Sequence, residues 1–159
     1  MSDDHSKENE FLQLDEFLCF AIYSASHAMN RLYKPFLTEL GLTYPQYISM
    51  VVLWEQDDRT VGDLCEKLFL ESSTLTPLLK RLEKMGLIER KRDPQDERKV
   101  RISLTTDGRE LRKKALTIPE CIISATGLSK KEIINLQNQI FLLRETLHKA
   151  ANSNIATKK

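Results

Sequence analysis

The apolar residues of this chain change their spacing in one place, and that change limits the folds open to it. Up to Gly86 they recur every three or four residues, which predicts amphipathic helices. From Leu87 to Leu104 they alternate with polar and charged residues on either side of a turn-like Asp93-Pro94-Gln95-Asp96, which predicts a β-hairpin. Helical spacing then returns. The sequence therefore predicts a mainly α-helical protein with one small hairpin.

Helix start and stop signals predict six helices around this hairpin. They are expected to begin near Leu14, Thr43, Thr60, Ser72, Thr105 and Ser129. Three of these starts combine a Ser or Thr with an acidic or amide side chain three residues later, which is the capping-box pattern. Gly41 and Gly86 supply two of the stops. The fifth helix is expected to run from Thr105 to the region of Cys121.

Composition and charge are those of a folded domain without a membrane span. With 159 residues, of which 41% are hydrophobic, the chain can bury one core but is short for two. It has no apolar run of about 18 residues. The N-terminal stretch MSDDHSKENE is acidic, whereas a signal peptide is basic and then apolar. We expect a cytoplasmic protein with no membrane partner.

The expected organisation is a single domain at residues 11–150 with a disordered tail at each end, 1–10 and 151–159. Its compact middle part, at 43–104, contains the short helices and the hairpin.

The helical segments on either side of the middle part, 11–41 and 105–150, are candidates for a dimer interface. Apolar residues of the last helix step by three and four, as in helices that pack side by side. They are Ile133, Leu136, Ile140, Leu143, Leu147 and Ala150. This face could equally cover the chain's own core. Because both segments lie outside the middle part, we expect a homodimer.

Two short helices followed by a charged hairpin are typical of the winged helix-turn-helix, whose second helix enters the major groove of DNA. Hydroxyl side chains suited to base edges occupy the first turns of that helix, at Ser72, Ser73, Thr74 and Thr76. Lys80 and Arg81 follow and suit the flanking phosphates. The alternative is that the hydroxyls only cap the helix and that the two cations form a solvated face.

The charge distribution supports binding to double-stranded DNA more clearly than the net charge of +1 does. Between Lys80 and Arg101 there are nine Lys or Arg residues and five Asp or Glu residues. A local basic surface can bind phosphates even where the whole chain is nearly neutral.

The hairpin also carries a specific resemblance. The stretch from Asp96 to Thr105, DERKVRISLT, resembles the D-x-R-x-x-x-x-x-L-T wing signature of the MarR family of bacterial regulators. The resemblance implies that Arg98 reaches into the minor groove and that Asp96 helps to hold it. A guanidinium suits a narrow minor groove because negative potential is concentrated there. The alternative is that Asp96 and Arg98 only close the turn as a salt bridge.

The first helix resembles one branch of that family, the organic-hydroperoxide-sensing OhrR branch. The resemblance covers the stretches LDEFLCFAIY at 14–23, NRLY at 30–33 and LTYPQ at 42–46. It implies that Cys19 is the peroxide-reactive thiol and that Tyr23, Tyr33 and Tyr44 surround it. Without the resemblance, a cysteine among apolar neighbours is more often an unreactive core residue.

Helix geometry limits how this thiol site can be built. Cys19 and Tyr23 are four residues apart and share one helix face. Tyr33 is 14 residues from Cys19, or about 21 Å along a continuous helix, so the two cannot touch within one chain. If Tyr33 contributes to the Cys19 site, it must come from the other subunit of a dimer.

The remaining cysteines determine which stable product an oxidised Cys19 can form. Cys121 resembles the resolving cysteine of the two-cysteine members of the branch, which implies an intersubunit Cys19–Cys121 disulfide. The alternative is an unreactive Cys121 and a small-thiol adduct on Cys19. Cys65 is expected in the core. By this resemblance the protein is a repressor that leaves a pseudo-palindromic operator when an organic hydroperoxide oxidises Cys19.

Three other functions stay open. One is a MarR-type repressor gated by a non-covalent aromatic ligand, with Cys19 a bystander. A thiol peroxidase is a second, although no CxxC, Gly-rich phosphate loop or metal-ligand cluster accompanies Cys19. His27 and His148 have no partner at metal spacing, so we expect no metal, no cofactor and no enzyme. The third is a protein-binding adaptor without DNA affinity, which the wing argues against.

Overall fold

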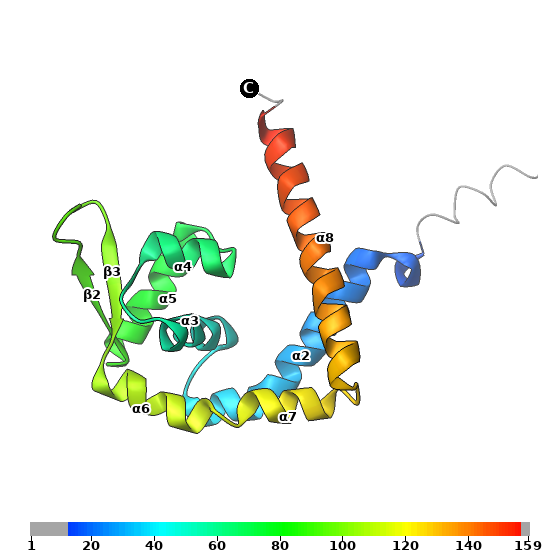
Figure 1. Cartoon of the computed structure of the whole chain (residues 1–159), viewed down its shortest axis with the longest axis horizontal. Helices are drawn as coiled ribbons and strands as arrows, with labels where there is room; N and C mark the ends of the chain where they lie inside the picture. The colour runs from blue at the N-terminus through cyan, green and yellow to red at the C-terminus, as the bar shows by residue number, and fades with distance from the viewer. Residues whose placement is uncertain (1–12, 157–159) are drawn as a thin grey trace, which may run out of the picture. The chain divides into compact units, whose positions relative to one another are not determined.

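The computed structural model describes residues 13–156 and confirms a mainly helical fold with a small antiparallel sheet (Figure 1). The elements in chain order are η1 (Leu14–Glu16), α2 (Leu18–Leu40), α3 (Tyr44–Glu55), β1 (Arg59–Thr60), α4 (Val61–Leu68), α5 (Ser72–Lys84), β2 (Ile88–Arg92), β3 (Val100–Leu104), α6 (Thr106–Ala115), α7 (Ile118–Ala125) and α8 (Lys130–Ala156). The expected tail at 1–10 lies outside the described residues. α8 continues into the expected tail at 151–159, of which 157–159 lie outside the description.

The chain forms two compact units, divided between Ile118 and Pro119. The first unit contains the elements from η1 to α6, and the second contains α8 and nearly all of α7. The assignment of 11–41 and 105–150 to a dimer interface within one domain remains a prediction.

One expected helix is in fact two. The sequence predicts a continuous helix from Thr105 to the region of Cys121, but α6 ends at Ala115 and α7 begins at Ile118. Pro119 explains the break, because proline has no N–H to donate to the carbonyl of Ala115 and its ring would collide with that carbonyl. In the first turn of α7 the same proline is tolerated.

The core of the first unit lies where α3, α4 and α5 meet the hairpin. Its fully buried side chains include Met50, Leu53, Leu64, Leu75, Leu79, Leu82, Ile88 and Ile102. The three leucines of α5 are spaced four and three residues apart, so they form one face of that helix. Burying each such side chain stabilises the fold by about 1.5–3 kcal/mol. The opposite face of α5 is left free for contacts outside the unit.

The sheet has three strands in the order β1-β3-β2, with both pairs antiparallel. The predicted hairpin is confirmed, with Ile88 opposite Leu104 and Arg92 opposite Val100. β1 pairs Arg59 with Ile102 on the other side of β3. The sequence does not predict β1, because two residues are too few to show alternation.

The hairpin joins α6 through a close backbone contact at Gly108. Thr105 caps α6 by accepting a 3.0 Å hydrogen bond from the Gly108 N–H, and its own hydroxyl donates to the carbonyl of Gly86 at 2.6 Å. Trp54 Nε1 of α3 donates to the Gly108 carbonyl at 2.8 Å. A Cβ on Gly108 would collide with the Leu87 carbonyl oxygen. Only glycine fits here without a shift of the backbone.

We therefore expect Gly108→Ala to lower the free energy of unfolding by about 1–3 kcal/mol through overpacking. Urea denaturation followed by circular dichroism measures the change. The control is Gly62→Ala in α4, where the nearest atom, Thr60 Oγ1, would be 3.7 Å from the new Cβ. That variant should be neutral or stabilised by up to about 1 kcal/mol. Equal stability of Gly108→Ala and wild type would contradict the close-contact explanation.

Candidate functional site

α5 presents a polar face opposite its buried leucines. Ser72, Ser73 and Thr74 are exposed and Thr76 is half-buried. The N-cap is Glu71 and forms no side-chain cap, so these hydroxyls are not used as the N-cap of the helix. Ser72 and Thr76 lie with their hydroxyl oxygens 3.5 Å apart.

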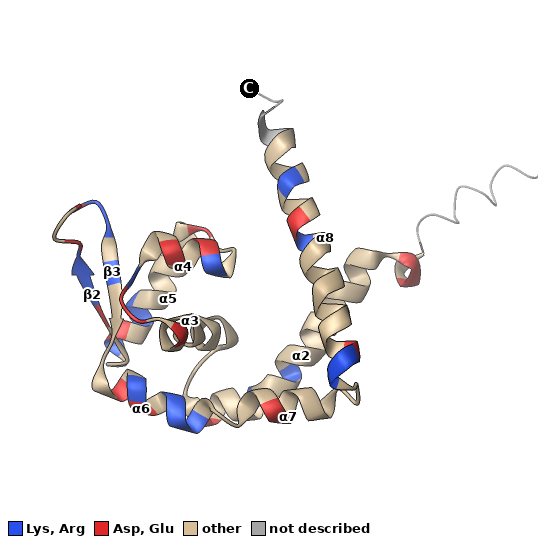
Figure 2. Ribbon diagram, viewed as in Figure 1, with Lys and Arg blue, Asp and Glu red and all other residues tan. Residues whose placement is uncertain are grey.

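Basic side chains continue this polar face and follow the hairpin. Lys80 and Arg81 of α5 are exposed. Figure 2 shows Lys and Arg on the hairpin strands and on the loop between them. The first unit thus carries hydroxyl groups and cations on α5 together with a basic hairpin.

The tip of the hairpin places Asp96 beside Arg98. Asp96 Oδ1 accepts hydrogen bonds from the Arg98 backbone N–H and from Arg98 Nε, each at 3.2 Å. The Arg98 side chain is nevertheless 92% exposed. The pair closes the turn, and its guanidinium projects into solvent; a role of Arg98 in DNA binding stays a prediction.

A second ion-pair network holds the base of the same turn. Arg101 Nε donates to Asp58 Oδ1 at 2.8 Å, and Arg101 Nη1 donates to Asp93 Oδ2 at 3.1 Å. The bond from Arg101 lowers the pKa of Asp58. The pKa of Asp93 is lowered first by the backbone N–H of Gln95 and then by Arg101. Both carboxylates therefore stay ionised at neutral pH.

Asp57 attaches the hairpin to the end of α3 at a further point. Its Oδ1 accepts from the Leu104 backbone N–H at 2.8 Å, and its Oδ2 accepts from Arg109 Nη2 at 2.7 Å. Sequence reasoning missed Asp57, Asp58 and Arg101 as site residues. The partners of the two aspartates are more than 40 residues away, and no local pattern relates such distant positions.

Cys19 lies in the first turn of α2 and is exposed. Tyr23, one turn further on, contacts both Phe20 and His27, with ring centroids 6.4 and 4.4 Å away. α2 is continuous from Leu18 to Leu40, so Cys19 and Tyr33 are separated by about 21 Å along one helix. Within the single chain, Cys19 is not a core residue and does not meet Tyr33.

The structure brings together the other two predicted tyrosines. The ring centroids of Tyr33 and Tyr44 are 5.0 Å apart, and Tyr47 lies 5.9 Å from Tyr33. Burial, together with Tyr44 and Tyr47, raises the pKa of Tyr33 to about 12. Burial also raises the pKa of Tyr44. The phenols are therefore neutral hydrogen-bond donors at physiological pH. Sequence reasoning missed Tyr47, although it lies one helical turn from Tyr44.

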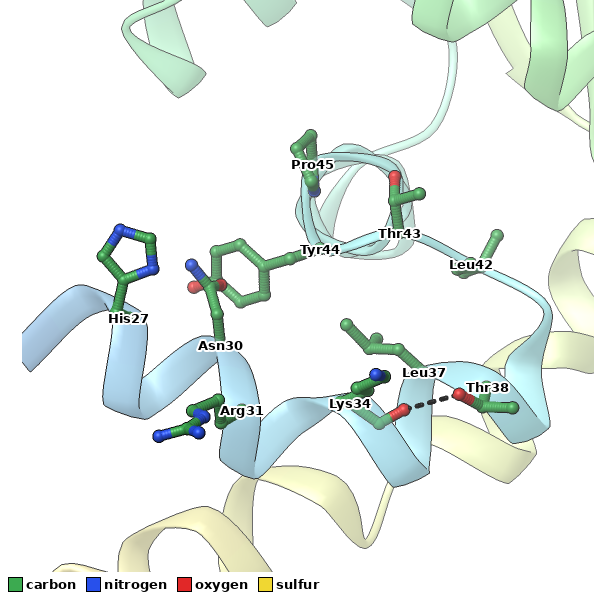
Figure 3. A pocket seen from close by; sticks show the side chains of 10 residues that line it. All are labelled: His27, Asn30, Arg31, Lys34, Leu37, Thr38, Leu42, Thr43, Tyr44 and Pro45. Atoms are coloured by element: carbon green, nitrogen blue, oxygen red, sulfur yellow. Dashed lines mark hydrogen bonds between the residues drawn. The ribbon is translucent and has the colours of Figure 1, made fainter.

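A cavity of about 430 Å³ opens between α2 and the start of α3 (Figure 3). It is lined by His27, Asn30, Arg31, Lys34, Leu37, Thr38, Leu42, Thr43, Tyr44 and Pro45. In Figure 3 the ring of Tyr44 extends from the start of α3 towards α2, the helix that carries His27 and Asn30. An aromatic ring, Tyr44, and two cations, Arg31 and Lys34, thus border one space.

The other two cysteines differ in exposure. Cys121 is exposed on α7, in the second unit. Cys65 is half-buried in α4, and burial raises the pKa of its thiol, with a further contribution from Glu71. All three thiols are unpaired in the chain.

Between residues 13 and 156 no three His, Cys, Asp or Glu side chains gather as a metal site. Nor is any helix in that range long and apolar enough to span a membrane.

Comparison with known proteins identifies the family. Residues 31–116 match the family model described as transcriptional regulator SarA/Rot. The chain is 46% identical over 143 residues to the organic hydroperoxide resistance transcriptional regulator of Bacillus subtilis (strain 168), covering 89% of this chain and 97% of that protein.

Solved structures of AbfR, a protein of Staphylococcus epidermidis, are similar as well. The structure of reduced AbfR bound to DNA has a TM-score of 0.71 and 32% identity, and covers 82% of this chain and 92% of that one. The structure of disulfide-formed AbfR has a TM-score of 0.58 and 32% identity, and covers 93% and 99%. The family predicted from the wing and the first helix is confirmed, and so is the expectation of a regulator in place of an enzyme. The chain belongs to the MarR/SarA family of transcriptional regulators.

Proposed function

We propose that this regulator is a dimeric, cytoplasmic repressor that leaves its operator DNA when an organic hydroperoxide oxidises Cys19. The observation that carries the proposal is the position of Cys19. It is an exposed thiol at one end of the same continuous helix that brings Tyr33 to a cluster of neutral phenols. Over 89% of its length the chain is similar to a relative described as an organic hydroperoxide resistance transcriptional regulator.

DNA binding is supported by the free polar face of α5 and by the projecting Arg98. In a winged helix-turn-helix, α5 would enter the major groove with Ser72, Ser73, Thr74 and Thr76 towards the bases, and Lys80 and Arg81 towards phosphates. Arg98, held by Asp96, would enter the minor groove. Reduced AbfR, at 32% identity, has been solved bound to DNA. Two such units in a dimer would suit a pseudo-palindromic site.

Dimerisation is supported by apolar side chains that the single chain leaves exposed. They include Leu18 at 61%, Ile22 at 42%, Leu142 at 70% and Leu147 at 58%. Leu18 and Ile22 are one helical turn apart on α2, so they can form one apolar face for a contact with a second copy. If the α2 helices of two copies cross in antiparallel orientation, Tyr33 and Tyr44 of one copy would lie near Cys19 of the other. The thiol site would then be complete only in the dimer.

The proposed chemistry has two steps. The Cys19 thiolate attacks an oxygen of the hydroperoxide, the O–O bond breaks, and the alkoxide leaves as an alcohol after taking up a proton. Cys19 is then a sulfenic acid. The Cys121 thiolate of the second copy attacks the sulfenic sulfur, the S–O bond breaks, and water leaves as the disulfide forms. A dithiol reductant reverses the change. A disulfide form of AbfR has been solved, which supports this route.

α3 offers a physical connection from the thiol site to the wing. Tyr44 begins this helix, Tyr47 contacts Trp54 with ring centroids 6.3 Å apart, and Trp54 donates to the carbonyl of Gly108 beside the hairpin. A movement of Tyr44 during oxidation would therefore be transmitted along a rigid helix. Because the two DNA-binding units must keep their spacing, a small shift would weaken both contacts at once.

The cavity between α2 and α3 favours one alternative. Its volume and its aromatic and basic lining suit a small aromatic ligand, which would gate DNA binding without any role for Cys19. Cys19→Ser distinguishes the two functions. The variant should abolish the induced release of DNA if Cys19 is the sensor. It should leave that release intact if a non-covalent ligand is the inducer.

The first test is fluorescence anisotropy of the reduced protein on a duplex from the promoter upstream of its own gene. We expect tight, salt-sensitive binding, loss of binding after stoichiometric cumene hydroperoxide, and recovery after dithiothreitol. A DNA affinity that peroxide leaves unchanged would contradict the redox switch and would favour the ligand-gated repressor.

Cysteine pairing is tested by peroxide treatment followed by non-reducing gel electrophoresis. Wild type should form a covalent dimer, and Cys19→Ser and Cys121→Ser should not. Cys65→Ser is the matched control, because Cys65 is half-buried and its raised pKa disfavours the reactive thiolate. A Cys121→Ser protein that still cross-links would show that Cys121 is not the resolving residue.

The wing contact is tested with Arg98→Ala. We expect an affinity loss of about tenfold and a salt slope smaller by about one. Thermal stability should hardly change, because an exposed ion pair contributes at most about 1 kcal/mol. Lys113→Ala in α6 removes the same charge from an exposed pair with Glu110 and should leave the affinity nearly unchanged. Equal losses in the two variants would mean that Arg98 acts only as a distant charge.

A further inference from the structure

Arg101 lies on the central strand of the sheet and forms four hydrogen bonds with two aspartates from different segments. Asp58 accepts three of them, at Oδ1 (2.8 Å), Oδ2 (3.0 Å) and its backbone carbonyl (2.6 Å). Asp93 Oδ2 accepts the fourth at 3.1 Å. Asp58 follows α3 and Asp93 directly follows β2, so Arg101 connects the end of the helix to the hairpin turn. A planar guanidinium has five N–H donors and can form all four bonds, whereas an ammonium has only three donors.

The bonds continue from Asp93 to the tip of the wing. Asp93 Oδ1 accepts from the backbone N–H groups of Gln95 and Asp96, at 2.8 and 3.3 Å. Asp96 Oδ1 then accepts from Arg98, through both its backbone N–H and its side chain. One continuous set of hydrogen bonds thus runs from the end of α3 to the proposed minor-groove residue.

The backbone conformation of Asp58 indicates that its contacts with Arg101 stabilise this arrangement. Asp58 has a φ of 58°, in the left-handed region that costs free energy for any residue with a side chain. Such a conformation persists only where the surroundings hold it. Here the Asp58 carboxylate and carbonyl both hold Arg101, which offsets the cost. Asparagine tolerates the same region, so Asp58→Asn removes the charge without adding backbone strain.

We propose that Arg101, held between Asp58 and Asp93, is a positioning residue that fixes the wing turn and thereby directs Arg98 into the minor groove. This inference rests on the proposed DNA binding by the wing. Arg101 does not need to touch DNA itself, because four of its five N–H donors already bond to the two aspartates. If the turn were disordered, Arg98 would keep its charge but would have no fixed position. Ordering the turn on DNA binding would then cost conformational entropy.

Charge alone predicts the opposite result from this proposal. Removing a carboxylate from a DNA-binding protein reduces repulsion of the phosphates and should strengthen binding. If Asp58 positions the wing, Asp58→Asn should weaken it. Glu97→Gln is the matched control, because it removes one negative charge at the tip of the same wing. The Glu97 carbonyl, which accepts from Arg92 Nη1, is retained. Glu97→Gln should bind as well as wild type or more tightly.

The experiment measures anisotropy of full-length reduced protein on the promoter duplex in four forms: wild type, Asp58→Asn, Arg98→Ala and the double variant. We expect Asp58→Asn to weaken binding about fivefold to tenfold, and to have little further effect once Arg98 is absent. A hydroxyl-radical footprint should lose protection at the outer minor grooves and keep it where α5 binds. Arg101→Lys keeps the charge but cannot form all four bonds, so it should behave like Asp58→Asn. It replaces Asp58→Asn if that variant does not fold.

Two results would overturn the inference. One is an Asp58→Asn protein that binds as tightly as wild type, and the other is a loss of equal size with and without Arg98. In both cases wild type still binds the duplex, so the proposed function survives. Failure of wild type to bind any promoter duplex would instead remove the proposed function and the inference with it.

Discussion

The contact between the end of α3 and the hairpin is the interaction on which the rest of the first unit depends. Asp57 and Asp58 supply it through the backbone of Leu104 and the side chain of Arg101, and Trp54 adds a bond to the backbone of Gly108 at the start of α6. A two-stranded hairpin by itself is only marginally stable in water. Attached at these points, it becomes a rigid extension of a helix whose other end carries Tyr44.

The unbroken length of α2 is the second constraint, and it acts on the thiol site. A straight helix keeps residues 14 positions apart well separated, so Cys19 cannot reach Tyr33 by local folding. The single chain therefore presents an exposed thiol at one place and a cluster of partly buried phenols at another. A site built from both requires two copies, which makes assembly a condition for the proposed sensing.

Local patterns predicted most of the secondary structure. The capping boxes at Thr43 and Thr60 are present, the hairpin has its expected strands, and the last helix starts where Ser129 and Glu132 predict. The prediction of a continuous fifth helix was wrong because it relied on apolar spacing and neglected Pro119, which interrupts the helix. β1 was missed because it is too short to have a period. Both errors concern backbone details that apolar spacing does not encode.

The sequence by itself determined the family, through the wing motif at 96–105 and the stretches that contain Cys19, Tyr33 and Tyr44. Short spacing also determined the wing pair, because a turn brings Asp96 and Arg98, two positions apart, within hydrogen-bond distance. Only the tertiary structure decided what holds the wing in place. Asp58 and Arg101 are 43 positions apart, and they meet because β3 is the central strand of the sheet and Asp58 directly precedes β1. Pairing between distant segments depends on the packing of the whole unit, and no local pattern contains it.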